Sequence, residues 1–329
     1  MEKMKGLAKV ELALIAAVIV VAGVVGAYFL YPRPKTQLIV STTTSLYETG
    51  FLDFLKQSFE QTNPGYNVSF ISQGTGQAIQ TAKLGQADMI LVHDPVQELP
   101  FLTDGFGVNR KIIAYNFFII VGPSNDPAEI RDLTPLDALK KIAAAGDSGN
   151  ALWVSRGDGS GTHGKEKRLW AAAGFNYTEI RTNSWYLEAG IGMTNTLQLA
   201  DQKDAYTLSD KASYLTNFAE GNIQLAKLVE GGGDLLNVYC AIPCNPQRLT
   251  NAKFDAAMTF TKYLVSDTGQ GLFNSFGVQD YGEAIFKPWV PVLESGNPAD
   301  LKQTVEQYAY FEGSECPTQF RYNADDLYG

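Results

Sequence analysis

Short apolar runs alternate with segments of helical spacing along the first third of the chain. The runs lie at 37–41, 68–72 and 87–93, and the segments between them at 52–62 and 77–85. Leu52, Leu55 and Phe59 recur as residues on one face of a helix do. Strand and helix units of this length predict an α/β protein with a mainly parallel sheet flanked by helices.

A second series of the same kind follows residue 116. It predicts helices at 135–146, 165–174 and 193–203, and strands at 151–155, near 181–187 and at 205–209. The segment 254–273 and a tail of aromatic-rich turns come after it. Two such series joined by extended segments predict two lobes connected by two chain crossings, near Tyr115 and Val238.

The expected division of the chain follows from these crossings. Residues 37–115 and 239–329 form lobe 1, and residues 116–238 form lobe 2. Residues 1–36 precede both lobes and read as a membrane segment with a proline-containing linker.

The N-terminal segment predicts a membrane anchor. Residues 12–30 carry no charge and, as a helix, would span roughly 28 Å, close to a bilayer core. Lys3, Lys5 and Lys9 precede them, which places the N-terminus in the cytoplasm and the remaining chain on the extracytoplasmic side. Residues 5–21 also resemble the signal of archaeal pilin-like secreted proteins, and this alternative predicts cleavage after Gly6.

The charge balance excludes one class of partner. The 329 residues contain 35 acids and 26 bases, a net charge of −9, and no Lys/Arg-rich run outside the first ten residues. Nucleic acid is therefore not an expected partner. An anionic small molecule remains compatible, because a few local donors can form its site.

The cysteines and histidines do not form a metal-binding pattern. Cys240, Cys244 and Cys316 lack zinc-ligand spacing, and His93 and His163 are far apart in sequence. In an extracellular setting, two states are open: a disulfide from Cys316 to Cys240 or Cys244, or free buried thiols. Asn67 and Asn176 begin glycosylation sequons.

Three turns rich in Ser, Thr and Gly each follow a predicted strand and precede a helix. They contain Thr43, Thr44 and Ser45 in the first turn, Thr75 and Gly76 in the second, and Ser160, Gly161 and Thr162 in the third. Small residues let the backbone approach a ligand, and free N–H groups at a helix start point toward it. Any one of these turns alone is better explained by helix capping, but three at the same ends of successive strands indicate an oxyanion site.

Arg156 lies in the third turn and is the expected countercharge. A guanidinium can donate two parallel hydrogen bonds to one oxyanion. The alternative is an ion pair with nearby Asp158.

Two catalytic patterns are nearly present in the third turn. Residues 159–166 lack only the final hydroxyl of a phosphate-binding loop, because Glu166 stands in its place. Asp158 replaces the first glycine of a G-x-S-x-G nucleophile elbow around Ser160, with His163 three residues later. Both departures favour a binding protein over an enzyme.

Six segments in order resemble the extracytoplasmic tungstate-binding proteins of ABC importers. They are TTTSLYETGFLDFLKQSFEQ, QGTGQAIQTAKLGQADMILVHDP, GFGVNRKIIAYNFFIIVGPSNDPAEI, WVSRGDGSGTHGKE, YLEAGIGMTNTLQLADQKDAYTLSD and FNSFGVQDYG. The resemblance covers roughly residues 38–290. It implies a two-lobed periplasmic-binding-protein fold of the two-crossing type, with tungstate, or also molybdate, held between the lobes.

The resemblance also implies site residues and partners. The ligand would contact Thr43, Thr44, Ser45, Thr75, Gly76, Arg156, Ser160, Gly161, Thr162, Gly192 and Met193. The partner would be an ABC transporter permease, without a cofactor or a protein-bound metal cation, and the soluble part would be monomeric.

Other hypotheses remain open at this point. The site could take molybdate, sulfate or phosphate, Ser160 and His163 could serve an extracellular hydrolase, or the chain could be a pilin-like surface protein. Two features depart from the family: the N-terminus suggests a direct anchor, and Cys240 and Cys244 occupy a predicted crossing strand.

Overall fold

The computed structural model describes residues 34–328, and residues 37–329 form one compact unit. Within the described residues, eight strands form one sheet: β1 (Thr36–Thr43), β2 (Tyr66–Gln73), β3 (Met89–Val92), β4 (Lys111–Gly122), β7 (Thr207–Asp210), β8 (Ala226–Glu230), β9 (Leu236–Pro243) and β10 (Lys287–Pro288). A separate pair consists of β5 (Trp153–Ser155) and β6 (Tyr186–Glu188).

Helices surround these strands. The α-helices are α2 (Thr44–Tyr47), α3 (Phe51–Thr62), α4 (Thr75–Lys83), α5 (Pro95–Thr103), α6 (Pro135–Asp147), α7 (Gly161–Ala172), α8 (Tyr177–Ile180), α9 (Met193–Gln202), α10 (Lys211–Ala219), α11 (Phe254–Val265), α12 (Asp267–Ser275), α13 (Val278–Tyr281), α14 (Val290–Ser295) and α15 (Ala299–Ala309). Short 3-10 helices are η1 (Gly233–Leu235), η2 (Thr318–Phe320) and η3 (Asp325–Leu327).

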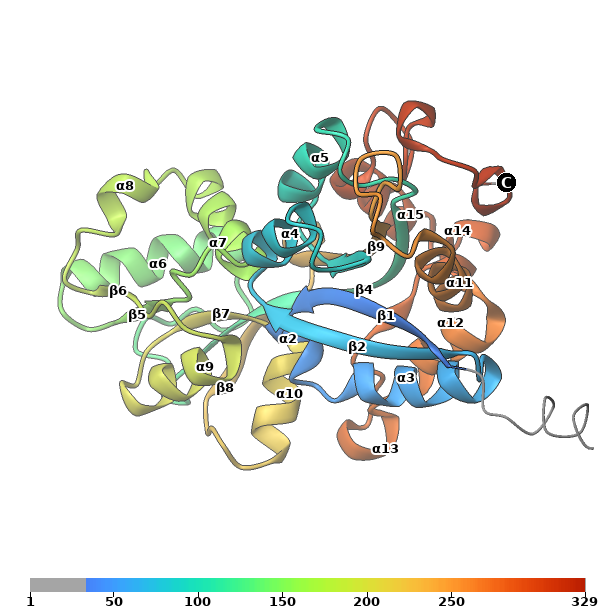
Figure 1. The fold of residues 1–329 in the computed structure, drawn as a ribbon. Helices are drawn as coiled ribbons and strands as arrows, with labels where there is room; N and C mark the ends of the chain where they lie inside the picture. The colour runs from blue at the N-terminus through green and yellow to red at the C-terminus, as the bar shows by residue number, and fades with distance from the viewer. Residues whose placement is uncertain (1–33, 329) are drawn as a thin grey trace, which may run out of the picture. The chain divides into compact units, whose positions relative to one another are not determined.

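Strands β4 and β9 link two groups of elements. They pair antiparallel with each other, and Tyr115 lies opposite Val238 in the register. The first part of β4 also pairs with β10, whereas its last residues pair with β7 and β8. We call residues 34–110 and 244–328 the terminal part and residues 123–235 the middle part. In Figure 1, β1, β2, α3 and α11 of the terminal part lie to the right, and α6–α9 of the middle part lie to the left.

The expectation of a mainly parallel sheet is wrong. β1 pairs parallel with β3, and β5 pairs parallel with β6, but β9 runs antiparallel to both β3 and β4. β7, β8 and β10 are also antiparallel to β4. The reason is topological: β4 carries the chain out to the middle part and β9 brings it back, so these two strands run in opposite directions.

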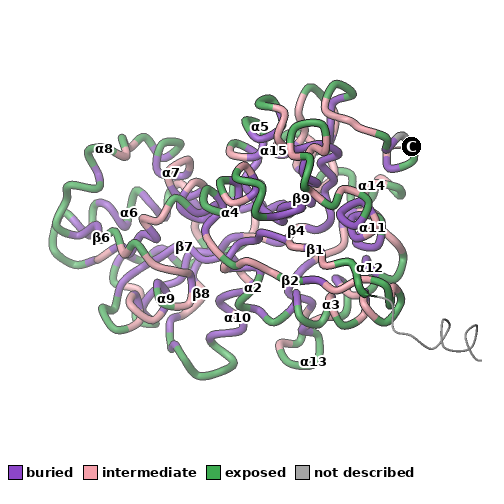
Figure 2. The backbone as a smooth tube through the Cα atoms, in the orientation of Figure 1, coloured by how far each residue is buried: buried purple, intermediate pink, exposed green. Residues whose placement is uncertain are grey.

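Each part has its own apolar core. In the terminal part, Leu55 and Phe59 of α3 pack with Leu38 and Val40 of β1. In the middle part, the aromatic residues Trp153, Trp170, Trp185 and Tyr186 gather between β5, β6, α6 and α7. β4, β7 and β9 are buried along almost their whole length, as Figure 2 shows. A linking strand buried on both sides positions the groups at its ends rigidly.

The C-terminal tail contains more structure than its aromatic composition predicts. Helix α15 presents Leu301, Val305 and Ala309 at intervals of four residues, and these pack on the cluster that contains Val238 and Ile242 of β9. The segment after α15 returns to the start of β4, where Tyr328 donates a hydrogen bond to the carbonyl of Arg110 at 2.8 Å.

The three cysteines adopt the second of the two states that the sequence leaves open. Cys240, Cys244 and Cys316 are buried free thiols, and burial raises the pKa of Cys244 to about 12.

The expected anchor at 12–30 and the cleavage after Gly6 lie outside the described residues. Among residues 34–328, no helix combines the length and the apolar character needed to cross a membrane.

Glu166 of α7 yields a prediction about stability. Its carboxylate is buried and accepts hydrogen bonds from Trp153 Nε1 at 2.7 Å, Ser155 Oγ at 2.8 Å and the hydroxyl of Tyr186. Burial raises the pKa of Glu166 from 4.5 to about 7. The folded state therefore holds this proton more tightly than the unfolded state, and the resulting stability is fully present below pH 4.5 and lost as the pH rises through 7.

We expect the difference in unfolding free energy between wild type and Glu166→Gln to change by about 2 kcal/mol between pH 5 and pH 8, with wild type losing stability as the pH rises. Urea unfolding at four pH values measures this difference. Parallel pH profiles for the two proteins would contradict it.

Candidate functional site

Three helices begin directly after strands or short turns at the junction of the two parts. The first residues are Thr75 of α4, Gly161 of α7 and Met193 of α9. Ser160 is the N-cap of α7, and its Oγ accepts a hydrogen bond from the backbone N–H of His163 at 3.2 Å. The first N–H groups of a helix have no partner within the helix, so such starts favour anions.

Two hydrogen bonds bring the predicted turns together across the two parts. The backbone N–H of Gly161 donates to Thr75 Oγ1 at 3.0 Å, and Arg156 Nη2 donates to Thr44 Oγ1 at 3.2 Å. Thr44 and Thr75 belong to the terminal part, whereas Arg156 and Gly161 belong to the middle part. The structure thus collects residues from all three predicted turns into one cluster.

Arg156 is the buried cation of this cluster. Its side chain is 2% exposed, and its guanidinium pairs with Asp158 as well as with Thr44. Its Nε is buried and has no hydrogen-bond partner among the described residues. The ion pair that the sequence offered as an alternative is therefore present, together with donor capacity that the protein does not use.

Thr43 and Ser45 belong to a hydrogen-bonded chain that leads to β9 and on to β4. The hydroxyls of these two residues lie 3.4 Å apart, and Ser45 Oγ lies 3.3 Å from His93 Nε2. His93 Nδ1 lies 2.9 Å from Asn237 Oδ1, and the Nδ2 of Asn237 donates to Asn116. Asn237 Oδ1 is thus an acceptor, so the Nδ1 of His93 carries the proton and Nε2 accepts from Ser45.

His93 is a site residue that the sequence did not single out. Burial lowers the pKa of its imidazole to about 4, so the ring is neutral. A Cβ added at Gly161 would lie 2.8 Å from His93 Cε1 and 3.1 Å from Thr75 Oγ1. Only glycine therefore fits at the start of α7, where the backbone passes this closely over His93.

The remaining predicted residues lie at the edges of the cluster. The side chain of Met193 is fully buried among apolar neighbours, so only its backbone N–H could reach a ligand. Thr194, the next residue, donates its hydroxyl to Glu48 Oε2 at 2.9 Å, and a Cβ on Gly192 would lie 3.3 Å from the same carboxylate. Gly76 is exposed and lies next to Gln97 instead.

Two further groups bear on the electrostatics of the cluster. Thr162 Oγ1 is buried without a hydrogen-bond partner among the described residues. Asp210, which the sequence analysis missed, is fully buried as the N-cap of α10 and accepts from the N–H of Ser213 at 2.9 Å. Burial raises the pKa of Asp210 to about 6, and the charge of Arg156 opposes this rise.

In both near-catalytic patterns, the phosphate-binding loop and the nucleophile elbow, the side chains contact other neighbours than the chemistry would require. Glu166 points toward β5 and β6, away from the turn that a nucleotide phosphate would occupy. His163 Nδ1 accepts from the N–H of Gly159 at 3.1 Å, and Nε2 lies 2.9 Å from the hydroxyl of Tyr177. Ser160 Oγ is engaged by the backbone of His163 rather than by its ring. Among the described residues, no group of three His, Cys, Asp or Glu side chains could hold a metal ion.

Two cavities open where the parts meet. One, of about 390 Å³, is lined by Asp94 and Gln97 from the terminal part and by Ser160, Lys167 and Arg168 from the middle part. The other, of about 490 Å³, is lined by Tyr47, Glu48 and Asp53 from the terminal part and by Thr194, Asn195 and Asn217 from the middle part. Both cavities are therefore bounded by residues of the two parts together.

Comparison with known proteins gives a consistent result. Residues 32–268 match the PBP superfamily domain. The tungstate-binding protein TupA of Peptoclostridium acidaminophilum is 37% identical over 259 residues, which cover 78% of this chain and 87% of that protein.

Two solved structures share this similarity. The tungstate-binding protein TupA from Desulfovibrio alaskensis is 37% identical, with a TM-score of 0.65, and the match covers 77% of this chain and 98% of that one. A structure described as the tungstate ABC transporter from Geobacter sulfurreducens is 39% identical, with a TM-score of 0.66, over 73% of this chain and 98% of that one. This chain therefore belongs to the PBP superfamily and, within it, to the family of solute-binding proteins that includes TupA.

Proposed function

We propose that this protein captures tungstate between its two parts and delivers the anion to an ABC transporter permease. The two parts act as lobes, residues 37–115 plus 239–329 and residues 116–238, which close on the ligand. The names of the related proteins support the choice of ligand and of transporter class. The protein binds and releases its ligand without catalysing a reaction and without a cofactor.

The observation that carries this proposal is the buried guanidinium of Arg156 at the junction. It touches Thr44 on the opposite part, and its Nε has no partner among the described residues. Asp158 already pairs with this guanidinium, but a buried donor such as Nε is costly to leave without an acceptor. A dianion that contacts Arg156 and the start of α7 on the middle part, together with Thr44 or Thr75 on the terminal part, satisfies donors on both parts at once.

The proposed ligand contacts use donors that do not titrate. Hydroxyl and backbone donors are expected from Thr43, Thr44, Ser45, Thr75, Gly76, Ser160, Gly161, Thr162, Gly192 and Met193, with Arg156 as the single cation. Each helix N-terminus contributes the equivalent of roughly half a positive charge, which offsets the rest of the dianion. In this structure Gly161 and Arg156 donate to protein acceptors, so the ligand takes the place of those contacts.

Selectivity follows from the protonation state of the ligand. Tungstate is an acceptor-only tetrahedron, whereas a protonated phosphate also needs an acceptor in the site. Tungstate and molybdate are nearly equal in size, so the site is expected to accept both. Sulfate and phosphate are the alternative ligands of the same chemical class.

We also propose an extracytoplasmic location, with residues 12–30 as the anchor. The uncharged segment and the preceding Lys3, Lys5 and Lys9 support this proposal. Family membership supports a position outside the cytoplasm, where a solute-binding protein meets its transporter.

Isothermal titration calorimetry with sodium tungstate tests the function directly. We expect tight binding of one tungstate per chain, competition by molybdate, and no displacement by an excess of sulfate or phosphate. Binding heat from sulfate or phosphate, with none from tungstate, would support an oxyanion site but contradict tungstate as its ligand. Absence of binding by all four anions would reject the function.

Arg156→Ala is predicted to weaken tungstate binding by about 2 kcal/mol or more, roughly thirtyfold, because a buried charged hydrogen bond to the anion is lost. Arg248→Ala is the matched control, since Arg248 is exposed and stacks on Phe106 in the terminal part. Calorimetry on both variants, with thermal melts to verify folding, measures the effect. Equal affinities for Arg156→Ala and wild type would assign Arg156 a structural role.

The raised pKa of Asp210 leads us to expect that tungstate binding depends on pH. A dianion near Arg156 raises the pKa of Asp210 further above 6, so binding takes up a proton and tightens as the pH falls from about 8 to 6.5. Asp210→Asn retains the capping acceptor and is expected to bind more tightly with a flatter pH profile. Asp255→Asn, an exposed position of α11, serves as the control. An unchanged pH slope in Asp210→Asn would remove Asp210 from the electrostatics of the site.

A further inference from the structure

Helix α15 and the segment that follows it lie beyond residue 268, where the match to the PBP superfamily domain ends. Val305 and Ala309 bury this helix in the cluster that contains Leu236 and Val238 of β9. The C-terminal segment is therefore packed directly on a strand that links the two parts.

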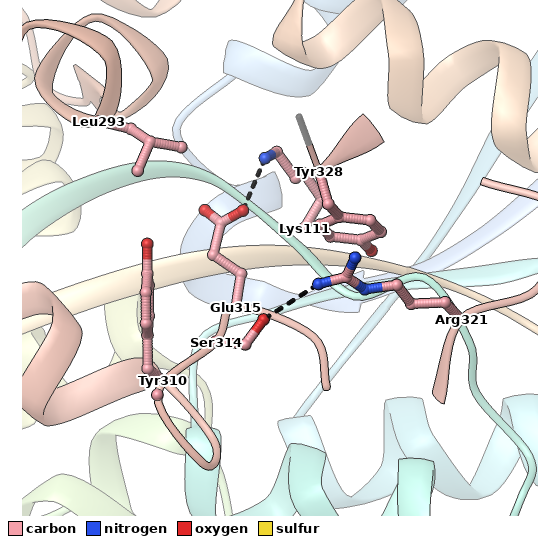
Figure 3. A pocket seen from close by; sticks show the side chains of 8 residues that line it. Lys111, Leu293, Tyr310, Ser314, Glu315, Arg321 and Tyr328 are labelled. Atoms are coloured by element: carbon pink, nitrogen blue, oxygen red, sulfur yellow. Dashed lines mark hydrogen bonds and ion pairs between the residues drawn. The ribbon is translucent and has the colours of Figure 1, made fainter. Parts of the chain in front are cut away.

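The segment after α15 also forms hydrogen bonds with the start of β4, the other linking strand. Glu315 accepts hydrogen bonds from Lys111 Nζ and from Trp289 Nε1, each at 2.6 Å, and its backbone carbonyl accepts from Arg110 Nη1 at 2.7 Å. Figure 3 shows Glu315 beside Lys111, with Arg321 directed toward Ser314. Because Lys111 and Glu315 are both nearly buried, this attachment is not a surface contact that salt would screen.

The same helix reaches α7 of the middle part. Lys165 Nζ lies 4.3 Å from the centroid of the Tyr308 ring and donates to the carbonyl of Leu236 at 3.1 Å. Lys165 is 4% exposed, so its ammonium meets a ring face and a carbonyl in place of water. An ammonium stripped of water gains more from an aromatic face than an exposed one does.

About one turn after Lys165, α7 makes a second contact with the terminal part through Arg168. Arg168 Nη1 lies 3.1 Å from Asp94 Oδ1, and Asp94 is buried at the start of α5 in the terminal part. Lys165 and Arg168 thus join α7 to two different helices of the terminal part. The first turn of this same helix carries Gly161 and Thr162, which face the proposed ligand.

We propose that Tyr308 and Lys165 form a clasp by which the C-terminal segment holds α7 in the closed arrangement and so strengthens ligand binding. The inference rests on the proposed function. The clasp joins the two parts, so it exists only when α7 lies against α15. A contact made in one arrangement shifts the population toward that arrangement by its own free energy. Tyr308 and Lys165 are therefore positioning residues that act on the ligand through the start of α7.

The charge of Lys165 determines the conditions of the test. Burial and, to a smaller extent, the charge of Arg168 lower the pKa of Lys165 to about 7, whereas Asp234 and Asp94 oppose the shift. At a pH of about 6, most of this ammonium carries its proton and the contact with the Tyr308 ring has its full strength.

The experiment is a double-mutant cycle on the full chain with tungstate as the probe, at a pH of about 6. Tyr308→Leu removes the ring face and is expected to weaken tungstate binding about five- to thirtyfold. Tyr308→Phe keeps the ring face and should retain the wild-type affinity. In a Lys165→Met background, Tyr308→Leu should have almost no further effect.

Amide hydrogen exchange measured without ligand tests the clasp independently of tungstate binding. The amides of residues 161–172 should exchange faster in Tyr308→Leu than in Tyr308→Phe, whether or not tungstate binds. Unchanged affinity in Tyr308→Leu, or fully additive effects in the double mutant, would overturn the clasp. If wild type binds no tungstate, the proposed function fails, and unchanged exchange in Tyr308→Leu would then overturn the clasp on its own.

Discussion

The antiparallel pairing of β4 with β9 is the constraint on which the rest of the structure depends. β4 pairs with β10 near its start and with β7 and β8 near its end, so this one strand joins strands of both parts in a single sheet. Asn237 of β9 anchors His93, which contacts Ser45 at the candidate site. The two linking strands thus determine both how the parts are connected and where the first turn of the site lies.

The site itself is a balance between one cation and several acids. Arg156 is paired with Asp158 and is coupled to Asp210, whose pKa is raised to about 6. Glu48 binds Thr194 at the start of α9. With so little net positive charge, backbone N–H groups and hydroxyls must supply most of the stabilisation of a dianion. This explains why an acidic protein can hold an oxyanion: the favourable field is local to the helix starts.

Sequence reasoning was most successful where a local pattern has one physical meaning. Ser, Thr and Gly after a strand indicate a helix start, and the three predicted turns lie at the starts of α2, α4 and α7. α9 begins at the predicted residue 193, whereas α7 begins at residue 161, four residues before the predicted start at 165. Strand direction was wrong, because antiparallel pairing with β9 depends on the path of the whole chain. His93 and Asp210 were missed since a lone residue after a strand has no spacing pattern. Their importance comes from neighbours such as Asn237, 144 positions away from His93.

The position of tungsten in crystals grown with tungstate most directly tests whether the anion binds between the two parts. Anomalous scattering from tungsten locates the anion without reference to the surrounding protein. We predict a single tungsten site within hydrogen-bond reach of Arg156 and of the backbone at the start of α7, with contacts to Thr44 or Thr75 from the opposite part. A tungsten site away from Arg156, or contacts from one part alone, would contradict it.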